Sequence, residues 1–199
     1  MKTQTRRSAR SWLGGAFQMP SVQTMVSRKS SITNAFVNSI IPIFPPSKAE
    51  ITDALSILKI DPSDLRCAYC GDRASEWDHL RPLVMNRRPT GFVSEIANLV
   101  PSCGKCNQSK GNKEWRTWMR SRAKLSPRSR GVADLEQRIS RLEEYERWKP
   151  ARNVGIQAIL GPVRWAQYWA CCDEVISALR KSQELADELK ALVMKSCSK

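Results

Sequence analysis

The stretch Cys67–Asn112 reads CAYCGDRASEWDHLRPLVMNRRPTGFVSEIANLVPSCGKCNQSKGN and carries the strongest signals in the chain. It begins with one Cys-x-x-Cys pair, Cys67 and Cys70, and has a second near its end, Cys103 and Cys106. Two such pairs supply four thiolates to one tetrahedral Zn²⁺ and leave no open position on the metal. The pattern predicts a structural zinc site; the alternative is four unrelated buried cysteines.

Between the two pairs lies Asp78-His79, and His79 is the single histidine of the chain. A neutral imidazole can take a proton from water near neutral pH. The oxygens of Asp78 and of Asn107, which directly follows the last paired cysteine, suit Mg²⁺ or Mn²⁺. Phosphodiester hydrolysis needs both functions, a base that activates water and a cation that stabilises charge on the phosphate.

Each of these residues also has a simpler interpretation. A lone histidine beside an aspartate is more often a surface hydrogen-bonded pair, and Asn107 can be a helix-terminal residue only. Adjacent residues of a strand point to opposite faces, so Asp78 and His79 serve one site only where the strand ends or bends. Pro82 makes such an end plausible, and the zinc would hold Asn107 close to the strand that carries Asp78.

The chain is strongly basic: 199 residues contain 33 Lys and Arg against 19 Asp and Glu, for a net charge of +14. Such a balance predicts a polyanionic partner, and nucleic acid is the commonest one. No apolar run approaches the ~20 residues that cross a bilayer, so no membrane partner is expected. Seven cysteines, of which four are paired by spacing, indicate metal-binding thiols in a reducing compartment. We expect a bacterial cytoplasmic protein.

Residues 1–46 are expected to form a basic N-terminal arm. No acidic residue occurs before Glu50, whereas Lys, Arg, Ser and Thr are frequent. An organellar presequence has the same composition and stays open, as does a mobile tail. Within the arm, residues 32–44 are more apolar and end in Pro45-Pro46, which predicts a packed extended segment.

Local patterns around the central stretch predict a strand, loop, strand, helix order set between helices. Ser47 and Glu50 have capping-box spacing, which favours a helix over 47–59. The remaining predicted elements are strands over 74–80 and 98–102, a loop over 81–91, a helical pattern from Gly104 onward, and helices over 131–148 and 162–195.

Lys and Arg dominate residues 110–130, where Glu114 is the acidic exception. A charge run is often only a solvated face, but this one begins at the proposed site, which favours phosphate contact. The residues expected to touch DNA are Lys110, Lys113, Arg116 and Arg120.

The C-terminal part carries apolar stripes at helical spacing over Val132–Leu142 and Leu185–Leu192. These stripes offer surfaces for a homodimer. Trp165 and Trp169 are expected in a core rather than on bases. Cys171 and Cys172 are expected to be buried small apolar residues.

Five elements in order, Cys-x-x-Cys, Asp-His, Asn-Leu-Val-Pro, Cys-x-x-Cys-Asn and Lys-Gly, resemble the HNH endonucleases with their ββα-metal fold. The resemblance covers about Leu65 to Met119 and is greatest to members with four zinc cysteines. It implies that His79 is the general base and that Asp78 and Asn107 bind the catalytic cation. It also implies that Asn98 holds the loop and orients the histidine. A further family histidine would fall at Gly111 and is absent.

The predicted fold class is α+β, mainly helical, with a zinc-stapled ββα-metal unit embedded between helices. Expected domains are the arm (1–46), the nuclease unit (47–125) and a helical region for DNA grip or dimerisation (126–199). The predicted function is a type II restriction endonuclease that uses Mg²⁺ or Mn²⁺ and cuts double-stranded DNA. The alternatives are a homing, phage-type or junction-resolving HNH nuclease, and, outside this class, a zinc-stapled nucleic-acid-binding module without catalysis.

Overall fold

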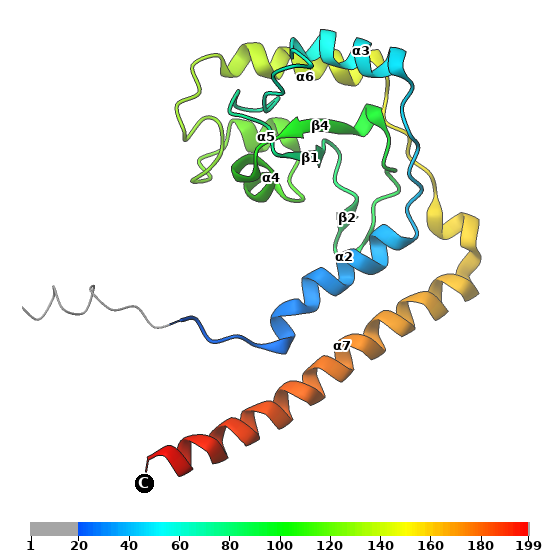
Figure 1. The fold of residues 1–199 in the computed structure, drawn as a ribbon. Helices are drawn as coiled ribbons and strands as arrows, with labels where there is room; N and C mark the ends of the chain where they lie inside the picture. The colour runs from blue at the N-terminus through cyan, green and yellow to red at the C-terminus, as the bar shows by residue number, and fades with distance from the viewer. Residues whose placement is uncertain (1–19, 199) are drawn as a thin grey trace, which may run out of the picture. The chain divides into compact units, whose positions relative to one another are not determined.

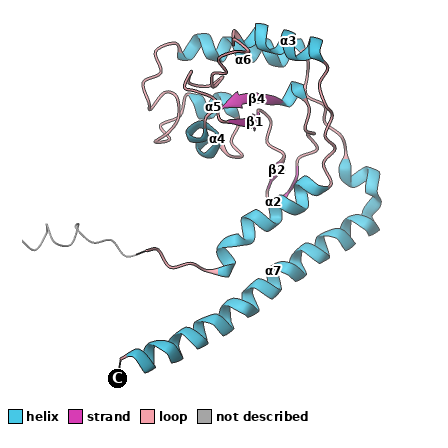
Figure 2. Ribbon diagram, viewed as in Figure 1, coloured by secondary structure: helices cyan, strands magenta, loops and turns pink. Residues whose placement is uncertain are grey.

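The computed structural model describes residues 20–198, which fall into two compact units. The larger unit is Ser30–Ile176; the smaller joins the described residues before Ser30 to those from Ser177 onward. In the smaller unit the Met25 backbone N–H donates to Gln183 Oε1 at 2.6 Å. The elements in chain order are η1 (Met25–Arg28), α2 (Lys29–Ser39), α3 (Lys48–Leu58), β1 (Glu76–His79), β2 (Val84–Met85), β3 (Arg88–Pro89), η2 (Ile96–Asn98), β4 (Leu99–Ser102), α4 (Gly104–Lys110), α5 (Trp115–Met119), α6 (Leu135–Trp148) and α7 (Ile156–Cys197) (Figures 1 and 2).

The larger unit is built around a two-stranded antiparallel sheet followed by a short helix. β1 pairs with β4 in the register Asp78 opposite Val100 and His79 opposite Leu99. α4 begins directly after β4 and contacts β1, while α3 and α6 pack against each other (Figure 1). This is the predicted strand, loop, strand, helix order, and the α+β, mainly helical fold class is confirmed.

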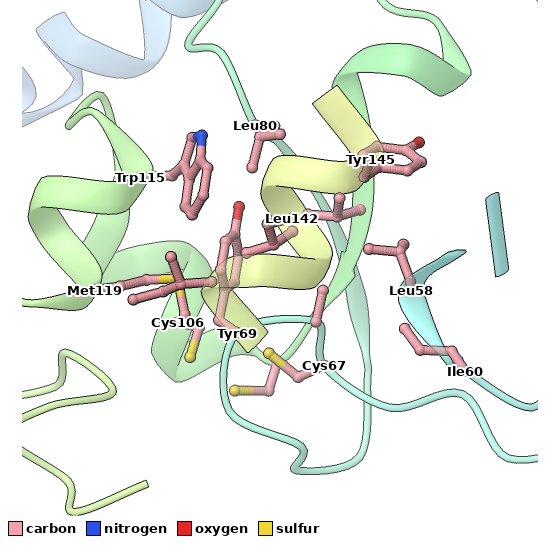
Figure 3. Packing of buried hydrophobic residues seen from close by; sticks show 14 of the residues in the cluster. Leu58, Ile60, Cys67, Tyr69, Leu80, Cys106, Trp115, Met119, Leu142 and Tyr145 are labelled. Carbon is pink, nitrogen blue, oxygen red and sulfur yellow. The ribbon is translucent and has the colours of Figure 1, made fainter. Parts of the chain in front are cut away.

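One buried cluster, which we call the knuckle core, surrounds the four paired cysteines (Figure 3). It draws on α3, the first cysteine pair, Leu80 directly after β1, β4, α4, α5 and α6. The edge of Tyr69 meets the Trp118 ring at a centroid distance of 5.2 Å. Its buried members are Ala54, Leu58, Ile60, Cys67, Ala68, Tyr69, Leu80, Val100, Cys103, Cys106, Trp115, Trp118, Met119, Ile139, Leu142 and Tyr145.

A second cluster, which we call the α2–α7 core, lies between α2, the connection from β1 to β4, and the part of α7 before Ser177. Tyr168 links α2 to α7, since its hydroxyl donates to Phe36 O at 2.9 Å. The Arg88 guanidinium lies 4.2 Å from the Trp169 ring centroid. Buried members of this core are Val37, Ile41, Leu83, Val93, Ile156, Trp169, Cys172 and Ile176.

Several predicted boundaries hold, and the reason is local. α3 has the predicted capping box: Ser47 Oγ accepts from the Glu50 N–H, and the Glu50 carboxylate accepts from the Ser47 N–H at 2.8 Å. Its last residue is followed by Lys59 in the left-handed conformation, which ends the helix. Trp169 is buried in a core, as predicted from its helical spacing.

Other local predictions are wrong. Residues 32–44 were expected to be extended, but α2 is helical, because Ile32, Phe36 and Ile40 recur at helical spacing and pack into the α2–α7 core. The helical pattern from Gly104 is two short helices, since the chain breaks at Gly111 with φ +50°. Cys171, expected to be buried, is exposed, whereas its neighbour Cys172 is buried.

Within the described part of the chain, none of the helices combines the length and the apolar character that a membrane span requires.

Candidate active site

The four cysteines of the two Cys-x-x-Cys pairs come together in the knuckle core. All four Sγ atoms lie within 4.8 Å of one another, and Cys70 Sγ is 3.6 Å from Cys103 Sγ. A tetrahedral site with Zn–S bonds of about 2.3 Å requires sulfur–sulfur separations of roughly 3.8 Å. The residues therefore fit one Zn²⁺ held by four thiolates. Hydrogen bonds from the Cys106 and Cys70 thiols lower the pKa of Cys67 to about 3, so this sulfur readily carries charge.

Two arginines that sequence reasoning missed lie beside this cluster. Arg130 Nη1 donates to Cys106 Sγ at 3.4 Å, and Arg138 Nη1 donates to Cys67 O at 3.2 Å. A guanidinium at a thiolate cluster offsets its negative charge. Gly71, with φ +79°, makes the close approach possible, because a Cβ there would lie 2.4 Å from Arg138 Nη2.

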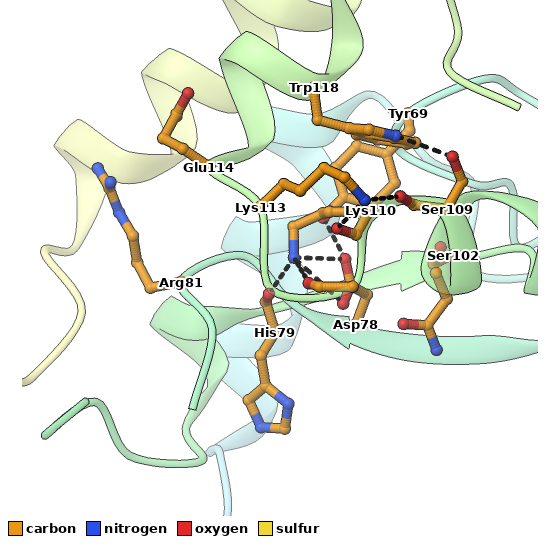
Figure 4. Close-up of polar contacts among 12 residues, drawn as sticks. Tyr69, Asp78, His79, Arg81, Ser102, Ser109, Lys110, Lys113, Glu114 and Trp118 are labelled. Carbon is orange, nitrogen blue, oxygen red and sulfur yellow. Dashed lines mark hydrogen bonds and ion pairs between the residues drawn. The ribbon is translucent and has the colours of Figure 1, made fainter. Parts of the chain in front are cut away.

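Asp78 is the third residue of β1 and is buried. Its carboxylate accepts a hydrogen bond from Tyr69 Oη at 2.6 Å and pairs with Lys110 Nζ at 3.1 Å (Figure 4). Burial raises the pKa of Asp78, and the Lys110 charge opposes that rise. The two partners hold the carboxylate in one orientation at the edge of the site.

Lys110 does not occupy the place that the sequence predicted. Its side chain has no exposed surface, and its ammonium group also donates to His79 O at 2.7 Å. In this position it cannot lie on a phosphate at the protein surface. The reason is the short helix α4, which directs the fourth residue after Cys106 back toward β1. Lys110 is thus part of the interior of the site rather than of a DNA-contact surface.

His79 is the last residue of β1, so the strand ends where the site requires it. Its ring is half-buried, and Nε2 lies 2.8 Å from Ser94 Oγ. Burial, helped by the nearby Lys110 charge, lowers the pKa of His79 to about 4. The imidazole is therefore neutral at pH 7, the form in which a histidine accepts a proton.

Asn98 is completely buried and holds the connection between β1 and β4. Its Oδ1 accepts from the Arg81 N–H at 2.7 Å, and its Nδ2 donates to Arg81 O and Val93 O. The loop-holding part of the role that the resemblance implied agrees with these contacts. The ring of His79, however, is bonded to Ser94 and not to Asn98.

Asn107 stands on the first turns of α4, and Glu76, at the start of β1, fixes its amide. Asn107 Nδ2 donates to Glu76 Oε2 at 2.6 Å. With Nδ2 turned to Glu76, the amide oxygen is the atom left for a cation. Sequence reasoning missed Glu76; its position two residues before Asp78, on the same side of the strand, was the available signal.

Asp78, His79 and Asn107 line one recess of about 210 Å³. Two exposed residues of α2, Asn34 and Asn38, one helical turn apart, line the same recess. The recess thus holds a neutral imidazole and two oxygen-bearing side chains that suit a hard divalent cation. No local pattern in the sequence placed α2 beside it.

Three further residues expected to touch DNA lie outside the interior. Lys113 is exposed, and its Nζ donates to Ser109 O at 2.7 Å. Arg116 pairs with Glu143 at 2.8 Å, and Arg120 pairs with Glu136. The carboxylates of α6 therefore offset part of the positive charge of the basic run at residues 110–130.

Comparison with known proteins agrees with this geometry. The family model for HNH endonuclease matches residues 67–113. CRISPR-associated endonuclease Cas9 of Corynebacterium diphtheriae is 35% identical over 80 residues, which are 38% of this chain and 7% of that protein. The chain therefore corresponds to a small part of that relative's length. No solved structure matches this chain. The matched segment contains both cysteine pairs together with Asp78, His79 and Asn107. Residues 67–113 are an HNH endonuclease domain.

Proposed function

We propose that this protein is a metal-dependent endonuclease that hydrolyses phosphodiester bonds of double-stranded DNA. The observation that carries the proposal is the single recess shared by Asp78, His79 and Asn107. The net charge of +14 supports a polyanionic substrate. The HNH domain and the relative named as an endonuclease support the same chemistry.

In this mechanism His79 acts as general base, because its neutral ring can take a proton from the attacking water. Asp78 and Asn107 would hold Mg²⁺ or Mn²⁺ through a carboxylate and an amide oxygen. Such a cation supplies positive charge for the phosphate and for the leaving 3′ oxygen. The expected products carry 5′-phosphate and 3′-hydroxyl ends. Tyr69 and Lys110 keep the Asp78 carboxylate in place, and Glu76 does the same for Asn107.

Within the HNH class we propose a bacterial cytoplasmic restriction endonuclease of type II. The chain has one histidine and therefore one such general base. A double-strand break at one site then calls for two copies, and we propose a homodimer. The nuclease unit 47–125 would be accompanied by the basic arm 1–46 and the helical region 126–199, which would grip DNA or dimerise. A homing, phage-type or junction-resolving nuclease is the alternative within the class.

The test is cleavage of plasmid DNA by the purified protein with Mg²⁺, with His79→Ala beside the parent. Loss of a positioned base should slow single-turnover cleavage by roughly a hundredfold or more and leave zinc content and DNA binding intact. Asp78→Ala and Asn107→Ala should weaken binding of the catalytic cation, so raised Mg²⁺ or Mn²⁺ should partly restore one of them. His79→Ala should not be restored, because added cation supplies no proton acceptor.

The competing function is a zinc-stapled nucleic-acid-binding module without catalysis. It explains the charge and the four cysteines equally well, but it gives no reason for a neutral histidine beside two oxygen ligands in one recess. Parental cleavage by His79→Ala, or DNA binding without any metal-dependent cleavage by the parent, would favour the module.

A further inference from the structure

The ring of His79 has one hydrogen-bond partner within residues 20–198, the hydroxyl of Ser94. The distance from Nε2 to Ser94 Oγ is 2.8 Å, and neither group is fully exposed. Ser94 lies near the end of the connection between β1 and β4, next to Val93, which is completely buried in the α2–α7 core. The base of the proposed reaction is therefore bonded to the connection that packs into the α2–α7 core.

Ser94 is itself held firmly by segments that lie outside the HNH domain. Its backbone N–H donates to Pro42 O at 3.2 Å, and its carbonyl accepts from the Phe44 N–H at 2.9 Å. The neighbouring Glu95 is buried; it accepts from the Arg152 N–H at 2.6 Å, and its other oxygen lies 3.5 Å from the Arg152 guanidinium. That guanidinium stacks 4.2 Å from the Phe44 ring centroid. Residues 42–44 thus fix the backbone of the serine, and Arg152 fixes the side chain of the residue that follows it.

The direction of the bond decides what the ring can do. A neutral imidazole carries one N–H, and its other nitrogen has the lone pair. If Ser94 donated to Nε2, the proton would lie on Nδ1 and the lone pair would be occupied. If Nε2–H donates to Ser94, Nδ1 keeps a free lone pair and can accept a proton from water.

We infer that Ser94 is the positioning residue of His79: its hydroxyl oxygen accepts a hydrogen bond from Nε2–H, fixes the ring plane and leaves Nδ1 as the proton acceptor. This inference rests on the proposed function of His79 as general base. It moves the orienting role from Asn98, whose amide bonds only backbone atoms of the loop, to a serine anchored by residues 42–44.

The test uses the fact that the chain has a single histidine, so a protein labelled with ¹⁵N-histidine gives the signals of one imidazole. At a pH where the ring is neutral, the parent should show the proton on Nε2 and a lone pair on Nδ1. Ser94→Ala should move both nitrogen shifts toward mixed tautomers, and Ser94→Thr, which keeps a hydroxyl, should restore the parental spectrum. Ser39→Ala removes a hydroxyl at the end of α2 that bonds Tyr168 Oη at 2.8 Å, and it should leave the spectrum unchanged.

Single-turnover cleavage at saturating DNA gives the second readout. Ser94→Ala should lower the rate by roughly tenfold, as for other residues that orient a functional histidine, without changing the DNA concentration at half saturation. Ser94→Thr should recover the rate. The role of Ser94 is overturned if the parental ring carries its proton on Nδ1, or if Ser94→Ala keeps the parental shifts and rate. If His79→Ala is inactive in that case, the proposed nuclease function still holds. If His79→Ala cleaves at the parental rate, the proposed nuclease mechanism is wrong, and the inference about Ser94 fails with it.

Discussion

The knuckle core and the α2–α7 core differ in what holds them together. The knuckle core has a polar interior, because three of the four paired cysteines, the Asp78 carboxylate and the Lys110 ammonium are buried beside its apolar residues. The α2–α7 core is apolar and aromatic, and it joins three segments that are far apart in sequence. The first core therefore contains buried charged groups that pair with one another, whereas the second consists mainly of apolar and aromatic side chains.

The candidate site lies where these two regions meet. Asp78 and His79 are adjacent, yet Asp78 bonds to Tyr69 of the knuckle core and His79 to Ser94 beside the α2–α7 core. Because the strand ends at His79, both side chains still line one recess. Two adjacent residues of one motif are thus positioned by two different regions of the larger unit.

Removing the zinc should be the most damaging change to this arrangement. Cys103→Ser, or a strong chelator, should unfold the knuckle core, because structural Zn²⁺ contributes on the order of 10 kcal/mol in small units. Near-ultraviolet circular dichroism should lose the tryptophan signal, and metal analysis should show one zinc per parental chain.

Cys171→Ser is the matched control, since Cys171 is exposed and lies outside the cluster. It should keep the zinc and the fold. A folded, active Cys103→Ser protein without zinc would show that the knuckle core does not need the metal to fold.

Breaking the buried ion pair should be the next largest effect. Lys110→Met leaves the Asp78 carboxylate buried with Tyr69 as its side-chain partner, which should cost about 3–5 kcal/mol in urea unfolding without added Mg²⁺. Lys113→Met, at an exposed position, should change stability by less than about 0.5 kcal/mol.

The double variant Asp78→Asn, Lys110→Met should recover part of that loss, because it leaves no unpaired buried charge. If Lys110→Met were as mild as Lys113→Met, the polar interior of the knuckle core would not be an energetic feature of the fold.

The pH dependence of cleavage should be the smallest effect near neutrality. With a pKa of about 4, His79 stays neutral from pH 8 to pH 5, so the single-turnover rate should change less than about twofold across that range. An unshifted histidine, with a pKa near 6.5, would lose most of its base form by about pH 5. The pKa of Asp78 is raised, and protonation of this carboxylate should also lower the cleavage rate as the pH falls.

The same shift has a stability consequence of defined sign. The folded pKa of His79 is lower than the unfolded one, so its contribution to stability is complete above about pH 6.5 and is lost progressively toward pH 4. Cleavage rates at saturating DNA measure the first effect over pH 4–8, and urea unfolding midpoints over the same range measure the pH dependence of stability. A rate midpoint near pH 6.5 would mean that the ring is not buried in the folded protein.

Much of the site could be predicted from the sequence because its signals are local. Cys-x-x-Cys spacing predicts the zinc cluster whatever the surrounding fold, since a metal requires only ligands at reachable spacing. Asp78-His79, Asn98 and Asn107 follow from motif order, and the Ser47 capping box follows from four consecutive residues.

What only the tertiary structure decided are contacts between segments distant in sequence. Charge pattern alone could not distinguish Lys110, buried on Asp78, from Lys113 at the surface, because burial depends on where α4 packs. Nor could spacing place Ser94 on the His79 ring or α2 beside the recess, since these contacts exist only once the α2–α7 core has formed. Local sequence determines which chemical groups this protein carries, and the packing of the two cores determines which of them meet.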